Sequence, residues 1–98
     1  MLKQEFTLEV TADNEFSILN RIVNVLNRRR VRIKRLLAHE HEDFRSGKAI
    51  LLLYTTTDMI EKVKHQLEKL IEVEEAIYTE GSSLFYELLE RSNNKQVI

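Results

Sequence analysis

The sequence contains no cysteine, no proline and no tryptophan, and only two glycines among its 98 residues. Without cysteine, the chain can form neither a disulfide framework nor a thiolate metal site. This absence is compatible with a reducing compartment, and we expect a cytoplasmic protein. The two glycines, Gly47 and Gly81, fall between periodic segments, where turns use them. The sequence therefore has no glycine-rich loop of the kind that cradles phosphate groups.

Long apolar runs are also missing. The longest extends from Ala49 to Leu53, whereas a membrane helix needs about 20 apolar residues. The first five residues become charged at once and do not resemble a signal peptide. The formal net charge of −1 gives no general attraction to nucleic acid or to an anionic membrane. We therefore expect no nucleic acid and no membrane as a partner, although six of the eight residues from Arg28 to Arg35 are basic.

The composition is that of one globular domain. A chain of 98 residues with 43% hydrophobic and 32% charged residues can bury a core and does not have the composition of a disordered segment. We assign residues 1–81 to the domain and residues 82–98 to a C-terminal extension with a polar tail.

Alternating apolar and polar residues predict strands over residues 2–11, 31–41 and 73–80. In the second of these, we expect Val31, Ile33 and Leu37 to share one face. A continuous apolar and β-branched run predicts a well-covered strand over residues 48–57.

Apolar residues at helical spacing predict a helix over residues 16–29, with Asn14 as its N-cap. A second helix begins near Asp58-Met59-Ile60-Glu61, an acidic variant of a capping box, and its apolar stripe extends to Ile71. Ser82 or Ser83 would cap a short final helix with one apolar face, formed by Leu84, Phe85, Leu88 and Leu89.

This order of elements predicts an α+β fold. Strand, helix, strand, strand, helix and strand follow one another, which is the ferredoxin-like βαββαβ arrangement. We expect a four-stranded antiparallel sheet with two helices on one face, plus a short C-terminal element.

No side chain has the setting of a catalytic nucleophile. Cysteine is missing, and no serine has a histidine and a carboxylate at a recognisable spacing. We therefore assign no catalytic residue and expect a protein that is not an enzyme. His39 and His41 would share a strand face, but no third metal ligand is evident. We interpret the run from His39 to Asp43 as the solvated end of a strand and assign no metal site.

The basic run from Arg28 to Arg35 has two interpretations. Cations at a helix C-terminus complement the helix dipole, whereas a ferredoxin-like RNA-binding module would use them to hold phosphates. Such a module also stacks bases on aromatic residues of its central strands, and residues 49–54 provide no aromatic pair. The RNA-binding module is kept as an alternative hypothesis.

The segment from Thr11 to Ser17 leads into the N-terminus of the first predicted helix. Free backbone N–H groups and the helix dipole favour an anion there, such as the carboxylate of an amino acid. Ordinary helix capping would account for the same residues. The residues alone leave both interpretations open.

Two segments of the chain resemble a known family. Asn14-Glu15-Phe16-Ser17-Ile18-Leu19-Asn20-Arg21-Ile22 resembles the loop and helix start of ACT domains. Gln66-Leu67-Glu68-Lys69-Leu70-Ile71-Glu72-Val73 resembles the second helix and strand entry of the small, regulatory subunit of acetohydroxyacid (acetolactate) synthase. The resemblance covers about residues 3–88. Its first motif is common to many ACT domains, and its second is short but more specific to this subunit.

The resemblance implies a regulatory subunit of an enzyme. It implies a homodimer in which the sheets join edge to edge, which would cover exposed strand edges. It also implies that the chain binds and activates a catalytic subunit that carries thiamine diphosphate, Mg²⁺ and FAD, while this chain holds no cofactor. In many members of the family a branched-chain amino acid, usually valine, binds at the ACT dimer interface and inhibits the enzyme.

By the same resemblance, an effector amino acid would contact Asn14, Ser17, Ile18, Leu19 and Arg32. The chain departs from the family at three positions. Ser17 stands where the loop usually has glycine, Arg32 stands where a second ligand-facing Asn is usual, and Arg30 replaces the usual glycine after the first helix. These departures bear on valine sensing and not on the fold or on partner binding. The chain resembles short, ACT-only small subunits, some of which activate without conferring valine inhibition.

For the contact with the catalytic subunit, we predict exposed basic or apolar side chains from two regions. The predicted partner-binding residues are Arg28, Arg29, Arg30, Leu84, Phe85 and Leu88. The alternative within the same family is a free-standing ACT domain that senses an amino acid and regulates another protein.

Overall fold

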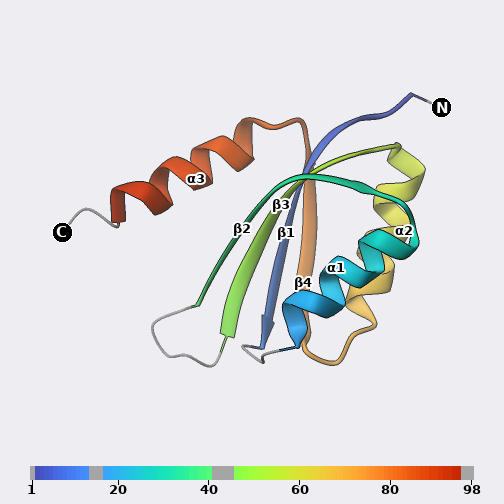
Figure 1. The fold of residues 1–98 in the computed structure, drawn as a ribbon, viewed down its shortest axis with the longest axis horizontal. Coiled ribbons are helices and arrows are strands. Elements are labelled where there is room, and N and C mark those ends of the chain that lie inside the picture. The colour runs from blue at the N-terminus through green and yellow to red at the C-terminus, as the bar shows by residue number, and fades with distance from the viewer. Residues whose placement is uncertain (1, 14–16, 41–45, 96–98) are drawn as a thin grey trace.

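The computed structural model describes residues 2–13, 17–40 and 46–95. Its elements follow the order β1 (Gln4–Asp13), α1 (Ile18–Arg28), β2 (Arg32–Glu40), β3 (Ser46–Thr55), α2 (Thr57–Glu68), β4 (Val73–Glu80) and α3 (Ser83–Lys95) (Figure 1). No helix within these ranges is long and apolar enough to cross a membrane.

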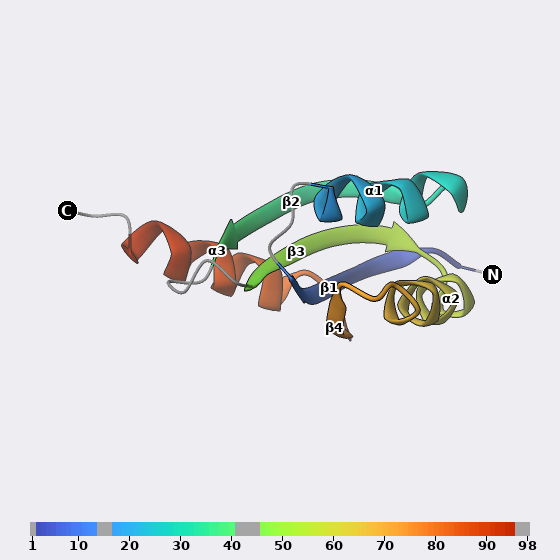
Figure 2. The same ribbon diagram turned by 90° about the horizontal axis from the view of Figure 1, so that it is seen from below.

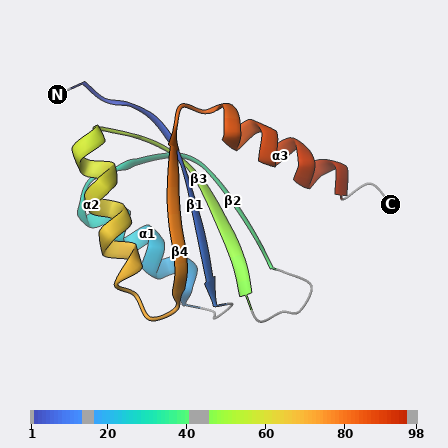
Figure 3. The same ribbon diagram turned by 180° about the vertical axis from the view of Figure 1, so that it is seen from behind.

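The four strands form one antiparallel sheet in the order β2-β3-β1-β4. β2 and β4 are therefore its two edge strands (Figure 2). α1 and α2 lie side by side over one face of the sheet, and α3 extends from the other side of the molecule (Figures 1 and 3). This arrangement confirms the predicted ferredoxin-like βαββαβ fold.

The main core lies between the sheet and the layer of α1 and α2. Alternate residues of β1 point to this layer, so that Phe6, Leu8 and Val10 are completely buried. Each of the two helices contributes one apolar stripe. α1 provides Ile22 and Leu26, and α2 provides Ile60, Val63 and Leu67. Because burying one large apolar side chain stabilises a fold by about 1.5–3 kcal/mol, this layer fixes both helices on the sheet.

A second, smaller cluster lies on the opposite face of the sheet. Phe85 of α3 packs with Ile50 and Leu52 of β3, and all three are buried. Leu88 and Leu89 of α3 are half-buried against the same cluster. The predicted final helix therefore exists, and its apolar face attaches it to the sheet.

The N-terminus of α2 differs from the predicted capping box. Thr56 is the N-cap, and its hydroxyl oxygen accepts a hydrogen bond from the Met59 backbone N–H at 3.2 Å. The extended backbone of Thr56 suits this role. β3 consequently ends at Thr55, and Asp58 lies in the first turn of α2, where its carboxylate complements the helix dipole.

The predicted apolar stripe of the second helix is wrong at Ile71, which is 96% exposed. α2 ends at Glu68. The Leu70 backbone N–H donates to the Leu67 carbonyl at 3.0 Å, and the Val73 N–H donates to the Leu70 carbonyl at 3.1 Å. These turn hydrogen bonds redirect the chain toward β4, so helical spacing no longer applies at Ile71.

The predicted alternation along the second strand is also wrong. The pairing of β2 with β3 shifts its register between Ile33 and Arg35, which makes Lys34 an extra residue in β2. A bulge of this kind reverses the faces of the residues that follow it. Ile33 therefore packs on the main core, whereas Leu37 packs on the second cluster.

Candidate functional site

The N-terminal end of α1 holds three of the predicted effector contacts. Ser17 is the N-cap and is exposed, and its side chain makes no capping hydrogen bond. Ile18 is buried and Leu19 is half-buried, and both pack on the main core. Of these three residues, only Ser17 therefore presents most of its side chain to a ligand. Asn14, the fourth predicted contact, lies outside the described residues, as does its predicted capping role.

The start of α1 is tied to the turn before β4. The Arg21 guanidinium forms an ion pair and hydrogen bond with the Glu72 carboxylate. The Asp13 backbone N–H also donates to the Glu72 carbonyl at 2.7 Å. Arg21 belongs to the first segment of the resemblance and Glu72 to the second, so the two segments meet in three dimensions. Both residues lie within the two segments that resemble the family, although their contact was not predicted from the sequence.

The C-terminal end of α1 closes with a left-handed residue. Arg30 has φ +56°, and its N–H donates to the Asn27 carbonyl at 3.0 Å. The Val31 N–H donates to the Leu26 carbonyl at 3.0 Å. These two bonds form a Schellman motif, in which the left-handed position is usually glycine. Arg30 therefore occupies the backbone conformation that favours glycine, the residue usual there in the family it resembles.

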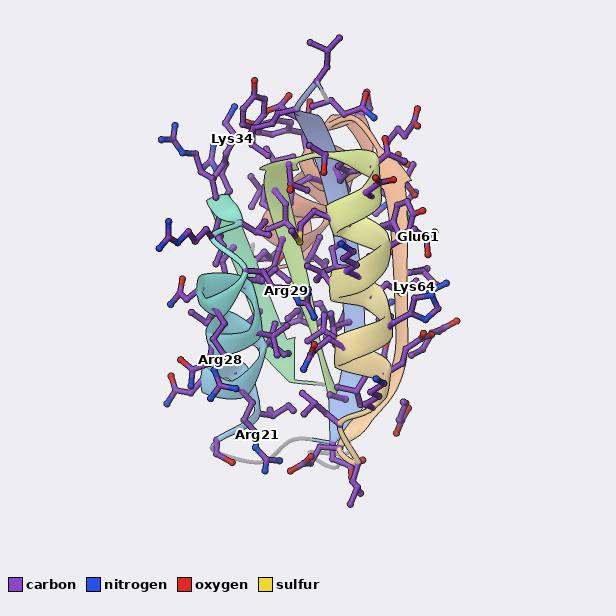
Figure 4. The ribbon with its side chains drawn as sticks, turned by 90° about the vertical axis from the view of Figure 1, so that its right-hand side faces the viewer. Arg21, Arg28, Arg29, Lys34, Glu61 and Lys64 are labelled. Carbon is purple, nitrogen blue, oxygen red and sulfur yellow. The ribbon has the colours of Figure 1, made fainter. Side chains whose placement is uncertain are left out.

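A shallow hollow of about 300 Å³ lies at the outer surface of α1 and α2. It is lined by Val25, Arg28, Arg29 and Gln66. The Arg29 guanidinium points from α1 toward α2 and donates to the Gln66 amide oxygen at 2.7 Å (Figure 4). Two of the predicted partner-binding residues are thus brought together here.

Ser17 and Arg32 lie far apart within one copy of the chain. Ser17 precedes α1 and Arg32 follows it, so the length of the helix separates them, about 16 Å at 1.5 Å per residue. Arg32 is exposed at the start of β2, opposite Tyr54. An effector that contacts both residues would therefore need a second copy of the chain.

The apolar part of the predicted partner surface lies in the second cluster. Phe85 is 1% exposed, and Leu84 and Leu88 are half-buried. These side chains cover the sheet because the helix that carries them packs on β3. They attach α3 to the sheet, so little of their own surface is exposed for contact with a partner.

A surface that sequence reasoning missed lies where β2, β3 and α3 meet. Tyr54 and Tyr86 are 39% and 45% exposed. The Arg35 guanidinium lies 5.7 Å from the centre of the Tyr86 ring. The Lys34 amine is 2.6 Å from a Glu5 carboxylate oxygen, and this hydrogen bond is the main cause that raises the pKa of Lys34. We call Lys34, Arg35, Tyr54 and Tyr86 the tyrosine–arginine patch. Lys34 and Arg35 belong to the basic run singled out in the sequence, but the bulge that brings Arg35 to Tyr86 could not be inferred from the alternation of residues.

Within the part of the chain that the structure describes, no group of three or more His, Cys, Asp or Glu side chains could hold a metal ion. His39 lies on β2, and His41 lies outside the described residues.

A comparison with protein families decides the identity of the fold. Residues 6–76 match the family model described as ACT domain. The chain belongs to the ACT domain family. ACT domains are regulatory, non-catalytic modules that commonly dimerise and bind amino acids.

Solved structures agree on the fold of this ACT domain. The ACT domain from GTP pyrophosphokinase of Chlorobium tepidum matches with a TM-score of 0.69 at 13% identity, over 79% of this chain and 99% of that chain. An uncharacterised protein from Thermotoga maritima matches with a TM-score of 0.66 at 15% identity, over 80% of this chain and 96% of that one.

The acetolactate synthase small subunit from Thermotoga maritima is also similar. It matches with a TM-score of 0.68 at 20% identity, over 76% of this chain. The match covers 47% of that subunit. No curated protein sequence matches the chain.

Proposed function

We propose that this ACT domain is the regulatory small subunit of acetohydroxyacid synthase, acting in branched-chain amino-acid biosynthesis in the cytoplasm. It binds and activates a catalytic subunit, and the thiamine diphosphate, Mg²⁺ and FAD belong to that partner. The observation that carries the proposal is the contact between Arg21 and Glu72. This contact joins the segment that resembles ACT domains in general to the segment that resembles this subunit.

We further propose that two copies pair through their β2 strands. An antiparallel pair centred on Leu36, which is 41% exposed, aligns Arg32 with the backbone position of residue 40 in the other copy and places no like charges opposite each other from Ile33 to His39. Like charges at facing positions destabilise a strand pair. The same pairing of β4, centred on Ile77, would place Glu74 opposite Glu80 of the partner subunit, and like charges there oppose it. The charge pattern therefore favours β2 as the dimer edge.

Pairing through β2 would also assemble the predicted effector site. The position of Glu40 lies at the end of the sheet where β1 ends and α1 begins, because β1 and β2 both run antiparallel to β3. Arg32 of the partner subunit would therefore come to the end that holds Ser17. Ser17 and Arg32 differ from the residues usual in the family, and we propose activation without strong valine inhibition.

The test is an enzyme assay of the acetohydroxyacid synthase catalytic chain from the same organism. The rate is measured with and without this protein, and each again with and without valine. We expect stimulation by the protein and little further change with valine. Absence of both stimulation and co-elution with the catalytic chain would refute the small-subunit role.

A second candidate is a free-standing ACT domain that senses an amino acid. The exposed Ser17 at the start of α1, whose side chain makes no capping hydrogen bond, favours it. Calorimetry with each of the twenty amino acids would detect such an effector. Heat of binding from one amino acid, together with no effect on the catalytic chain, would support this candidate over the first.

A further inference from the structure

We propose that the tyrosine–arginine patch is the docking surface for the catalytic subunit, and that it receives a segment with a carboxylate side chain flanked by apolar residues. This inference rests on the proposed function and adds the place of contact and the chemistry of the partner. The patch lies on the side of the sheet opposite α1 and α2, away from the hollow between Arg28 and Gln66.

The first observation is the exposure of two large aromatic side chains at one place. Phe6 and Phe85 are buried, whereas Tyr54 and Tyr86 keep 39% and 45% of their surface in water. Arg35 pairs with Leu52, two residues from Tyr54 on the same face of β3, and its guanidinium lies over the Tyr86 ring, so both phenols lie beside Arg35. Tyrosine and arginine are the residue types that carry most of the binding free energy at protein interfaces.

The second observation is that one of the two cations in the patch is paired with a carboxylate and the other is not. Lys34 is already paired with Glu5 at 2.6 Å. Arg35 forms no ion pair with any carboxylate in the described ranges, and its guanidinium lies over the Tyr86 ring, 5.7 Å from the ring centre. The guanidinium is therefore available for a carboxylate, which it can bind through two parallel N–H donors.

The third observation is that Arg35 is held before a partner arrives. Stacking on Tyr86 restricts the guanidinium, so less conformational entropy is lost when it binds a carboxylate. Phe85 also contacts Tyr86 edge to face, with ring centres 5.5 Å apart, and Phe85 is buried. The ring under Arg35 is thus fixed to the core through its neighbour.

The same contacts favour a protein over a nucleic acid. A base stacks on a free aromatic face, and Arg35 already lies over the Tyr86 ring. A nucleic acid strand also needs several free cations along its phosphates, whereas of the two cations in the patch itself Lys34 is paired with Glu5. One unpaired guanidinium between two phenols instead matches one carboxylate between apolar side chains.

The position of the patch fits the proposed dimer. An antiparallel β2 pair keeps the helices α1 and α2 of both copies on the same side of the joined sheet. Both patches would then lie together on the opposite side, next to the shared edge. Because Arg35 is next to Leu36 on the proposed shared edge, the oligomeric state of each variant is measured by sedimentation velocity alongside its affinity.

The test measures the dissociation constant of the full chain from the acetohydroxyacid synthase catalytic chain, by fluorescence anisotropy, together with the stimulation of activity. We expect Arg35→Glu and Tyr54→Ala each to weaken binding about tenfold or more. Lys62→Glu makes the same charge reversal at an exposed position of α2, outside the patch, and should stay within about twofold of wild type.

Four results would overturn the inference. The first is unchanged affinity in Arg35→Glu and Tyr54→Ala while wild type still activates, which leaves the small-subunit role intact. A tenfold loss in Arg28→Glu alone would place the contact at the hollow between α1 and α2 instead. Retention of an oligouridine probe that disappears in Tyr54→Ala would assign the patch to nucleic acid. If wild type neither binds nor activates the catalytic chain, the proposed function fails, and the inference fails with it.

Circular dichroism and the urea midpoint of each variant show whether it is folded. Tyr54→Ala lies on β3 and Arg35→Glu on β2, so neither depends on α3 remaining docked. Agreement between these two folded variants therefore reports on the surface and not on the attachment of α3.

Discussion

Arg30 shows how one residue can oppose the fold that contains it. Its φ of +56° lies in the left-handed region, which costs a residue with a Cβ atom about 1–2 kcal/mol. Glycine avoids this cost but loses more backbone entropy on folding. We therefore expect Arg30→Gly to raise the free energy of unfolding by about 0.5–1 kcal/mol. Urea unfolding monitored by circular dichroism would show it as a higher midpoint at an unchanged slope.

Charge provides a rival explanation for any gain in stability at Arg30. The substitution also removes one cation from a segment with six basic residues in eight positions. Arg30→Ala removes the same charge but keeps a Cβ atom, so it should gain little. Equal stabilisation by alanine and glycine would show that repulsion between the arginines, and not the backbone, limits stability here.

At the scale of elements, a hydrogen bond connects α2 to β4. The Tyr78 hydroxyl donates to a Glu61 carboxylate oxygen. This hydrogen bond is the first cause that raises the pKa of Tyr78, with a smaller contribution from the removal of water. Because the folded state holds the phenol proton more tightly than the unfolded chain does, the added stability is fully present below the unfolded pKa of about 10. It is lost as the pH rises through the higher pKa of the folded state.

We therefore expect the stability difference between wild type and Tyr78→Phe to shrink as the pH rises. Urea midpoints at pH 8, 9, 10 and about 11 would measure it, with both proteins compared at each pH. Lysine side chains titrate equally in both proteins, so they cancel in the difference. A constant difference across this range would mean that the phenol proton makes no pH-dependent contribution to folding.

The elements also show what the sequence could predict. Strands β1 and β4 and both main helices follow from periodicity, because each buries one face and periodicity reports which face is buried. β3 follows instead from its continuous apolar run, because it is covered on both faces. The bulge at Lys34 does not follow, since it depends on the pairing of β2 with β3 and not on local preference. The exposed Ile71 was missed for a similar reason, because the end of α2 is set by turn hydrogen bonds.

The candidate site was less predictable than the fold. Phe85 was expected on the surface, but α3 uses it to cover β3. The approach of Arg35 to Tyr86 joins residues distant in the sequence and depends on the reversal of faces after Lys34. Ser17 and Arg32 are a site only if a second copy supplies one of them. A motif in one chain can name such residues but cannot bring them together.

At the scale of the whole molecule, the two open edges of the sheet provide a matched experiment. Leu36 on β2 and Ile77 on β4 are apolar and almost equally exposed, at 41% and 43%. If β2 is the dimer edge, Leu36→Lys places two cations against each other at the two-fold axis and should convert a dimer to a monomer. Ile77→Lys adds the same charge at the other edge and should leave the dimer intact.

Sedimentation velocity over a range of protein concentrations would distinguish these outcomes. We expect Leu36→Lys to raise the dimer dissociation constant by about tenfold or more, because like charges at facing positions destabilise a strand pair and the buried apolar contact is lost. Dissociation by Ile77→Lys alone would move the interface to β4, despite its opposed glutamates. That result would also separate Ser17 from Arg32 of the partner subunit, and the proposed effector site would then have to be abandoned. The oligomeric state of these two variants therefore tests the geometry of the effector site without any effector.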